Sequence, residues 1–271
     1  MINKDLPAFF VVGAGKAGTS SLFYYLNEHP QIYMLPYKDV ACYFCETYGM
    51  PLSFKEYKNL LMPNDSSVCR VVGDVCHAYL TDTNSAQKIH QSFPDAKIVV
   101  VLRNPADRAF SLYAYLIREG YEYATSFEEA LKLEETRFER NILKDSSLVQ
   151  GYRNNYLYYR SGCYAEQVER YLNKFDRSQI LFKKYEDMKI DLGGFVKDIY
   201  HFVGVEDSFE FTMLFGETIT KEEVVVTFLA LLELLKLKEI TIVQDKLFGD
   251  ICIQKRDYVE LVDYDHTQDD H

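Results

Sequence analysis

Several features that define other protein classes are absent from this sequence of 271 residues. It contains no tryptophan, no internal repeat and no low-complexity tract or linker that would separate domains. Residues 1–271 are therefore expected to form a single domain. No apolar run is long and uncharged enough to cross a bilayer, and the short polar start at residues 1–7 does not have the pattern of a signal peptide. We therefore expect a cytoplasmic protein without a membrane partner.

Positive charge is also scarce. The chain carries 30 Lys and Arg against 41 Asp and Glu, which gives a formal net charge of −11. This balance excludes a general surface for nucleic acid or for anionic lipid. It disfavours a highly sulfated or carboxylated polymer as a partner, whereas a small neutral or cationic molecule suits it. Any anionic ligand must be held by a local basic pocket.

Cysteine is infrequent, and its spacing does not define a metal site. Cys42 and Cys45 form a C-x-x-C pair, but no second pair follows at metal-ligand spacing. We therefore expect that no metal is required. In a chain without a leader sequence, the six cysteines are expected to be reduced, free thiols.

What the sequence does contain is an alternation of apolar runs and helical patterns. This alternation predicts an α/β fold with a central parallel sheet flanked by helices. The clearest strand is KIVVVL at 97–102, because it is apolar on both faces. The other expected strands are 9–12, 70–73 and 179–183. The expected helices are 17–27, 38–46, 54–61, 84–93, 105–119, 126–144, 163–175, 192–203 and 224–237.

The most informative segment is VVGAGKAGTSSL at 11–22, a glycine-rich turn between the first strand and the first helix. Glycines let several backbone amides approach one anion, and a helix N-terminus adds unpaired N–H groups and a favourable dipole. Lys16 supplies positive charge. The turn differs from a Walker A loop, in which the lysine follows the last glycine, because Lys16 precedes Gly18. The candidate phosphate-binding residues are Gly15, Lys16, Ala17, Gly18, Thr19 and Ser20.

A second candidate site follows the KIVVVL strand. Arg103 stands at the carboxyl end of that strand, where open α/β sheets bind ligands, and its planar guanidinium suits a phosphate. Ser111 lies eight residues further on, about two helical turns, so it can share a face with residues 104 and 108. The structural alternatives are a strand-end salt bridge for Arg103 and a surface ion pair for Arg108.

Together the two segments resemble sulfotransferases that use 3′-phosphoadenosine 5′-phosphosulfate (PAPS). Residues 13–22 resemble the 5′-phosphosulfate loop of that family. The segment from Arg103 to Tyr113 resembles its 3′-phosphate motif, in which Arg103 and Ser111 would hold the 3′-phosphate. Weaker matches are Gly162-x-Tyr164 and the YEDM segment at 185–188. The resemblance covers residues 7 to about 205, whereas 206–271 diverge and lack the basic loop with which many members close over PAPS.

The resemblance implies a P-loop-like sulfotransferase of the small-molecule, bacterial or cytosolic type, with PAP as product. It would transfer the sulfuryl group to a hydroxyl or amine, as in tailoring of a natural product in secondary metabolism. Lys16 would stabilise the transferring group. Two residues compete as general base: His77 overlays a catalytic histidine segment of the small-molecule branch, and Lys38-Asp39 matches a Lys-Glu pair of the glycan branch.

Two other functions remain open at this level. A P-loop-type small-molecule kinase requires a Walker A lysine and a strand-terminal Asp for Mg²⁺, but the KIVVVL strand ends in Arg103. A nucleotide-binding protein without transferase activity is the second alternative. The presence of Lys16, Arg103, Ser111 and a candidate base argues against it.

Overall fold

The computed structural model of the chain divides into two compact units, residues 1–206 and 207–271, and each is described by itself. No helix among the described residues is long and apolar enough to span a membrane. The structure describes residues 8–35, 42–45, 52–63, 69–139, 156–205, 208–210, 220–237, 239–244 and 251–255.

The first unit contains a five-stranded parallel sheet, which confirms the predicted α/β class. The strand order is β2-β3-β1-β4-β5. After β1 the chain builds β2 and β3 on one side, then crosses over to build β4 and β5 on the other. The loops that leave β1 and β4 therefore diverge, and ligands of open α/β sheets bind at such a point. The strands are β1 Ala8–Gly13, β2 Ile32–Met34, β3 Val71–Val75, β4 Lys97–Leu102 and β5 Ile180–Lys184.

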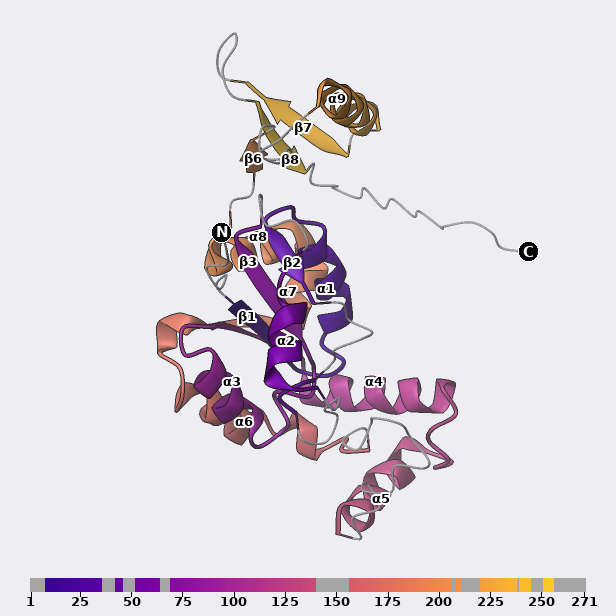
Figure 1. Cartoon of the computed structure of the whole chain (residues 1–271). Coiled ribbons are helices and arrows are strands. Elements are labelled where there is room, and N and C mark those ends of the chain that lie inside the picture. Colours follow the sequence, from indigo (N-terminus) through magenta and orange to yellow (C-terminus); the bar gives the residue numbers. More distant parts are fainter. Residues whose placement is uncertain are drawn as a thin grey trace, which may run out of the picture. The chain divides into compact units, whose positions relative to one another are not determined.

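Helices cover both faces of this sheet (Figure 1). Helices α1, α7 and α8 gather on one side and α3 and α6 on the other. The helices of this unit are α1 Thr19–Asn27, α2 Phe54–Leu60, α3 Ser85–Ser92, α4 Pro105–Arg118, α5 Phe127–Glu139, α6 Tyr164–Leu172, α7 Tyr185–Ile190 and α8 Leu192–Val203, with 3₁₀ turns η2 Arg160–Gly162 and η3 Arg177–Gln179.

Local sequence explains where several helices start. The side chain of Asn104 accepts hydrogen bonds from the N–H groups of Ala106 (3.0 Å) and Asp107 (3.3 Å), and Pro105 occupies the first position of α4. Ser53 and Glu56 form a capping box at the start of α2. Helix α4 therefore begins directly after β4, which fixes the position of Arg103 between them.

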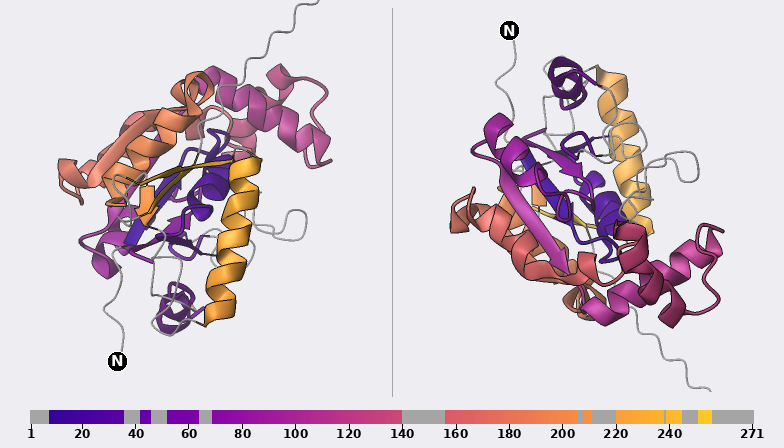
Figure 2. Two further views of the ribbon diagram at one scale, coloured as in Figure 1. Left: turned by 90° about the horizontal axis from the view of Figure 1, so that it is seen from above. Right: turned by 90° about the horizontal axis from the view of Figure 1, so that it is seen from below.

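Helices α4 and α5 extend beyond the end of the sheet (Figure 2). A separate small core joins them, in which Leu116, Ala130 and Tyr158 are fully buried. Glu122 accepts hydrogen bonds from Arg137 at 2.6 and 2.7 Å and from the Tyr158 hydroxyl at 2.6 Å. This network supports α4 along the half that lies away from the sheet.

Within its described residues, the second unit contains a three-stranded antiparallel sheet in the order β6-β8-β7 and the helix α9. The helix at 221–236 agrees with the predicted helix at 224–237, whereas the strands had no recognisable pattern. Ile253 and Leu231 are buried in this unit. Its elements are β6 Ser208–Glu210, α9 Lys221–Lys236, β7 Ile240–Val243 and β8 Cys252–Lys255.

Other element predictions differ from the structure, and helix α7 at Tyr185–Ile190 was not predicted. Residues 42–45 form a turn instead of part of a helix, and the rest of the helix expected at 38–46 lies outside the described residues. The three-residue strand β2 was not predicted, since so short a run has no readable period. Strand β3 continues through Asp74 to Val75, although a carboxylate was expected to end it.

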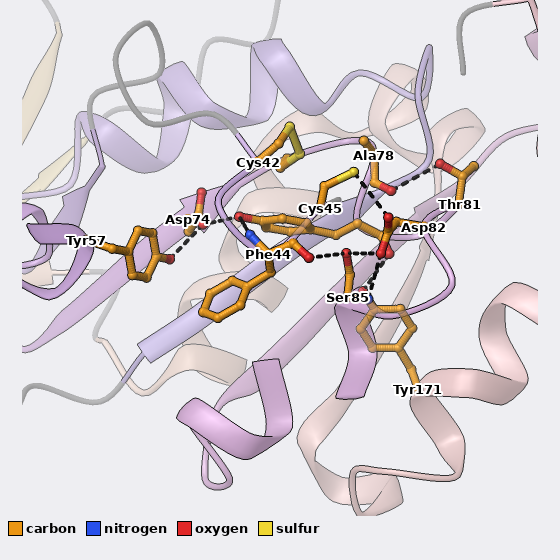
Figure 3. Close-up of a disulfide and its surroundings, with 12 residues drawn as sticks. Cys42, Phe44, Cys45, Tyr57, Asp74, Ala78, Thr81, Asp82, Ser85 and Tyr171 are labelled. Atoms are coloured by element: carbon orange, nitrogen blue, oxygen red, sulfur yellow. Dashed lines mark hydrogen bonds between the residues drawn. A yellow bond between two sulfur atoms is a disulfide. The ribbon is translucent and has the colours of Figure 1, made fainter. Parts of the chain in front are cut away.

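Asp74 remains inside the strand because two tyrosines satisfy its carboxylate. It is 3% exposed, and the hydroxyls of Tyr57 and Tyr79 each donate a hydrogen bond of 2.8 Å to its Oδ2 (Figure 3). Burial raises the pKa of Asp74 to about 6, against the lowering effect of these hydrogen bonds and of the Val75 amide. The folded protein therefore binds this proton more tightly than the unfolded chain.

The first prediction concerns the pH dependence of stability. Between the ordinary Asp pKa near 4 and the folded value of about 6, the folded state binds more protons, so stability should fall as pH rises through this window. A shift of about two units corresponds to about 3 kcal/mol. Urea unfolding from pH 4 to 7 should show this slope in the wild type and lose it in Asp74→Asn. The exposed-site control Asp95→Asn should keep it, and an equal slope in Asp74→Asn would contradict the assignment.

Candidate functional site

The predicted phosphate loop runs from the end of β1 at Gly13 to the start of α1 at Thr19. Its backbone is anchored to the neighbouring strand, since the Ala14 N–H donates to the Val101 carbonyl at 2.6 Å. Within the turn, the Ala17 N–H donates to the Ala14 carbonyl at 3.1 Å. The loop is thus held by β4, the strand that carries Arg103 at its end.

Two glycines of the loop are required by what surrounds them. Gly18 has φ of 78°, and a Cβ there would lie 3.1 Å from the Met188 sulfur and from the Tyr185 ring. A Cβ on Gly15 would lie 3.2 Å from Cδ2 of His77. The loop is therefore covered by the YEDM segment at one glycine and by His77 at the other.

Helix α1 begins with an N-terminus that suits an anion. Gly18 at its N-cap has no side chain to accept from the first amides, and the first turn contains no acidic residue. Thr19 is buried, whereas Ser20 is exposed. The first amides and the helix dipole thus favour negative charge at the turn.

Lys16 is held at both its backbone and its side chain. Its φ of 69° is uncommon for a residue other than glycine, and its carbonyl accepts a hydrogen bond of 3.0 Å from the Arg103 guanidinium. Its ammonium lies 4.2 Å from the centroid of the Tyr115 ring. Burial lowers the pKa of Lys16, as do the charges of Arg118 and then Arg103, while Glu119 raises it.

Arg103 contacts several of the segments that the sequence analysis singled out. Its guanidinium lies 4.7 Å from the centroid of the Tyr185 ring, and its carbonyl accepts a hydrogen bond of 2.9 Å from the Tyr164 hydroxyl. The next amide, of Asn104, donates to Glu186 at 3.1 Å. All four segments that the sequence singled out therefore meet at the carboxyl ends of β1, β4 and β5.

The two polar candidates on α4 differ in surroundings. Ser111 is partly buried on this helix, eight residues beyond Arg103. Arg108 is 2% exposed and donates from Nη2 to the carbonyls of Tyr158 and Leu157, the second at 3.5 Å. Its Nε has no hydrogen-bond partner among the described residues. Arg108 thus joins α4 to the segment directly before η2, and its burial excludes the surface ion pair that was one expectation.

His77 follows β3 and lies beside the loop. It is partly buried, against Gly15 as described above. Burial lowers its pKa to about 4, and the positive charge of Lys16 lowers it further in the same direction. The imidazole is therefore neutral near pH 7 and able to accept a proton. The competing candidate, Asp39, and its neighbour Lys38 lie outside the described residues.

The expectation that all cysteines are free is wrong for two of them. Cys42 and Cys76 form a disulfide at a sequence separation of 34 (Figure 3). The C-x-x-C spacing gave no indication of this pair, because folding beside the sheet brings the two cysteines together. The disulfide is adjacent to His77 and ties its loop to the segment that follows Lys38-Asp39. Cys45, Cys69, Cys163 and Cys252 take no part in a disulfide, as expected.

The described residues contain no group of three or more His, Cys, Asp or Glu side chains that could hold a metal ion.

The three loop glycines, Gly13, Gly15 and Gly18, also have the G-x-G-x-x-G spacing of dinucleotide-binding folds. What distinguishes this loop is the charge that it carries, because Lys16 lies within it and Arg103 binds it from the next strand.

Fold and site together define an α/β protein with a glycine-rich loop that carries Lys16 and contacts Arg103 at the switch point of its sheet. The Sulfotransferase domain family matches residues 7–250, so the chain belongs to the sulfotransferase family. The crystal structure of a sulfotransferase from Alicyclobacillus acidocaldarius is 33% identical, with a TM-score of 0.60 over 86% of this chain and 92% of that one.

Curated relatives match over shorter shares of their length. Human heparan sulfate glucosamine 3-O-sulfotransferase 6 is 27% identical over 75% of this chain and 54% of its own. Membrane-associated sulfotransferase kil1 of Dictyostelium discoideum is 31% identical over 42% of this chain and 24% of its own. The chain thus spans about a quarter to a half of the length of these relatives.

Sequence reasoning missed the aromatic residues of the site. Tyr185 was noted as part of a motif but not as the ring that lies over Arg103, and Tyr115 was not considered. Both are contacts between segments far apart in sequence. Since 22 tyrosines are present, composition could not distinguish these two.

The second prediction concerns the disulfide. A cross-link closing a loop of this length stabilises a protein by about 2–4 kcal/mol, mainly by restricting the unfolded chain. The double variant Cys42→Ser/Cys76→Ser should lose that amount in urea unfolding, whereas Cys69→Ser/Cys163→Ser should lose much less. Alkylation of the protein in freshly lysed cells, followed by mass spectrometry, should leave Cys42 and Cys76 unlabelled. Full labelling of both would contradict the bond.

Proposed function

We propose that this enzyme transfers the sulfuryl group of PAPS to a hydroxyl or amine of a small-molecule acceptor. The observation that carries the proposal is the hydrogen bond from Arg103 to the Lys16 carbonyl, which joins two cationic, anion-binding segments at one end of the sheet. PAPS carries a phosphosulfate on the 5′ position and a phosphate on the 3′ position of one ribose. Two adjacent anion sites on separate loops suit such a donor.

The proposed roles follow from charge and position. Amides and hydroxyls of residues 15–20 bind the 5′-phosphosulfate, and Arg103 and Ser111 bind the 3′-phosphate. Lys16 stabilises negative charge on the transferring sulfuryl group and on the oxygen that departs. His77 or Asp39 takes the proton of the acceptor as its oxygen or nitrogen bonds to sulfur and the sulfur–oxygen bond of the donor breaks. No metal is needed in this scheme.

The acceptor is proposed from charge. A protein with a net charge of −11 repels a polyanion, so a small neutral or cationic acceptor fits better. A natural product modified in secondary metabolism belongs to this class. The names of the relatives above include heparan sulfate glucosamine as an acceptor, which makes a glycan the second candidate. A screen of both classes with labelled PAPS distinguishes them.

A cytoplasmic location is proposed on the sequence features described above. The Cys42–Cys76 disulfide is unusual for such a location, because cytoplasmic thiols are generally kept reduced. The alkylation experiment therefore bears on location as well as on the bond.

The match to the sulfotransferase family argues against the kinase alternative, and a measurement of turnover tests the non-catalytic alternative.

The third prediction tests the donor. The protein should bind PAP much more tightly than ADP, because only PAP has the 3′-phosphate proposed for Arg103 and Ser111. A charge-assisted contact is worth about 1.5–3 kcal/mol, so Arg103→Ala should weaken PAP binding by about tenfold or more. Calorimetry measures both. Arg70→Ala is the matched control, since Arg70 precedes β3 and lies at the opposite end of the strands. Equal affinity for PAP and ADP would refute the donor assignment.

The fourth prediction tests the base. His77→Ala should fold, bind PAP normally and lose about 10²- to 10⁴-fold in kcat. The pKa of His77, followed by NMR, should be about 4 in the free protein and should rise when PAP binds, because bound phosphate offsets the Lys16 charge. The exposed-residue control His201→Ala should change neither quantity. If Asp39→Asn abolishes turnover and His77→Ala does not, the base is Asp39.

A further inference from the structure

Tyr115 lies near the carboxyl end of α4, and its ring faces the side chain of Lys16. The Lys16 ammonium is 4.2 Å from the ring centroid, well within the distance of about 6 Å at which a cation is attracted to an aromatic face. The two residues come from different motifs, 99 positions apart in sequence (115 minus 16). The two residues are therefore brought into contact only when the chain folds.

The backbone of Lys16 leaves its side chain little freedom at its origin. The residue has φ of 69°, and its carbonyl accepts the hydrogen bond from Arg103. The N–H of the next residue, Ala17, donates a hydrogen bond of 3.1 Å to the Ala14 carbonyl. The direction in which the side chain leaves the loop is thus fixed. Contact with Tyr115 fixes where the long, flexible side chain ends.

The charges around the ammonium are mostly of its own sign. Arg118 and Arg103 both act on Lys16 as like charges, and the Arg118 guanidinium lies 5.3 Å from the same Tyr115 ring. The nearby acid, Glu119, already accepts two hydrogen bonds from Arg118, at 2.8 and 2.9 Å. Among the described residues, no carboxylate lies within ion-pair distance, 4.0 Å, of Lys16.

An aromatic face differs from a carboxylate in what it does to the lysine. A carboxylate at this position would neutralise Lys16 and would compete with an incoming anion. A ring attracts the ammonium through its quadrupole, more weakly than a charge-assisted hydrogen bond does, and leaves the charge in place. The ring therefore holds the ammonium in position without neutralising its charge.

We propose that Tyr115 is a positioning residue for the transfer reaction: its ring face holds the Lys16 ammonium at the loop, charged and directed, to meet the sulfuryl group. This inference rests on the role proposed above for Lys16. It assigns the function to the ring face of Tyr115 and not to its hydroxyl, and this distinction makes it testable.

Four variants separate the ring from the rest of the side chain. Tyr115→Phe keeps the ring, Tyr115→Leu and Tyr115→Met remove it, and Phe110→Leu removes an exposed ring from the same helix. With PAPS and an accepted acceptor, Tyr115→Leu and Tyr115→Met should lower kcat by about 3- to 30-fold, the rate equivalent of one cation–π contact. PAP affinity should change less than twofold. Tyr115→Phe and Phe110→Leu should behave as wild type.

A second readout does not depend on activity. Lysines of the full-length protein are converted to ¹³C-dimethyl-lysines, which remain cationic, and Lys16→Ala identifies the signal of residue 16. The ring current of Tyr115 should shift that signal upfield in the wild type and in Tyr115→Phe. The shift should vanish in Tyr115→Leu and Tyr115→Met. Thermal melts identify any variant that fails to fold, and the other ring-free variant then provides the comparison.

The outcomes separate this inference from the proposed function. Normal or increased kcat in both ring-free variants overturns the positioning role, as does an equal loss in Tyr115→Phe. Absence of the upfield shift in the wild type overturns the contact itself. Normal turnover in Lys16→Ala refutes the proposed role of Lys16, and the positioning role with it, even where the shift shows that the contact exists.

Discussion

The hydrogen bond from the Arg103 guanidinium to the Lys16 carbonyl links the two halves of the site. It is possible because β1 and β4 are neighbours in the sheet, while the chain leaves them toward opposite sides of the sheet. The loop after β1 turns toward α1, and the chain after β4 turns into α4. Ligands of open α/β sheets bind where two such loops diverge, and Lys16 and Arg103 place positive charge there. The family motifs are far apart in sequence but adjacent at this one edge.

The cost of this arrangement is a concentration of positive charge in a protein that is otherwise acidic. Lys16, Arg103 and Arg118 act on one another as like charges, and burial adds to the lowering of the Lys16 pKa. Aromatic rings lower the electrostatic free energy of these cations without neutralising them. The ring of Tyr115 lies against Lys16 and Arg118, and the ring of Tyr185 lies against Arg103. An anion that enters the site replaces part of the lost hydration. The same repulsion that destabilises the free site thus favours ligand binding.

The sequence predicted what is local and missed what depends on packing between distant segments. Strand β4 was predicted to the residue because both of its faces are apolar. The anion-binding roles of Lys16 and Arg103 stay a prediction, which rests on a glycine-rich loop after β1 and on a position directly after β4. The Cys42–Cys76 bond and the rings of Tyr115 and Tyr185 depend on segments that meet only after folding. The strand expected at 70–73 continues through Asp74 because the hydroxyls of Tyr57 and Tyr79 satisfy its carboxylate, and these two partners could not be identified from sequence.

The proximity of His77 to Lys16 affects the order of events in the proposed reaction. The charge of Lys16 helps to keep His77 neutral at pH 7, so the imidazole is available as a base before the acceptor binds. If His77 is the base, its protonation adds a second positive charge near that of Lys16, and negative charge on the departing group would stabilise this state. Departure of that group removes the compensation and lowers the pKa of His77 again. Release of product and release of the proton are therefore coupled, and the site returns to its starting charge without a separate step.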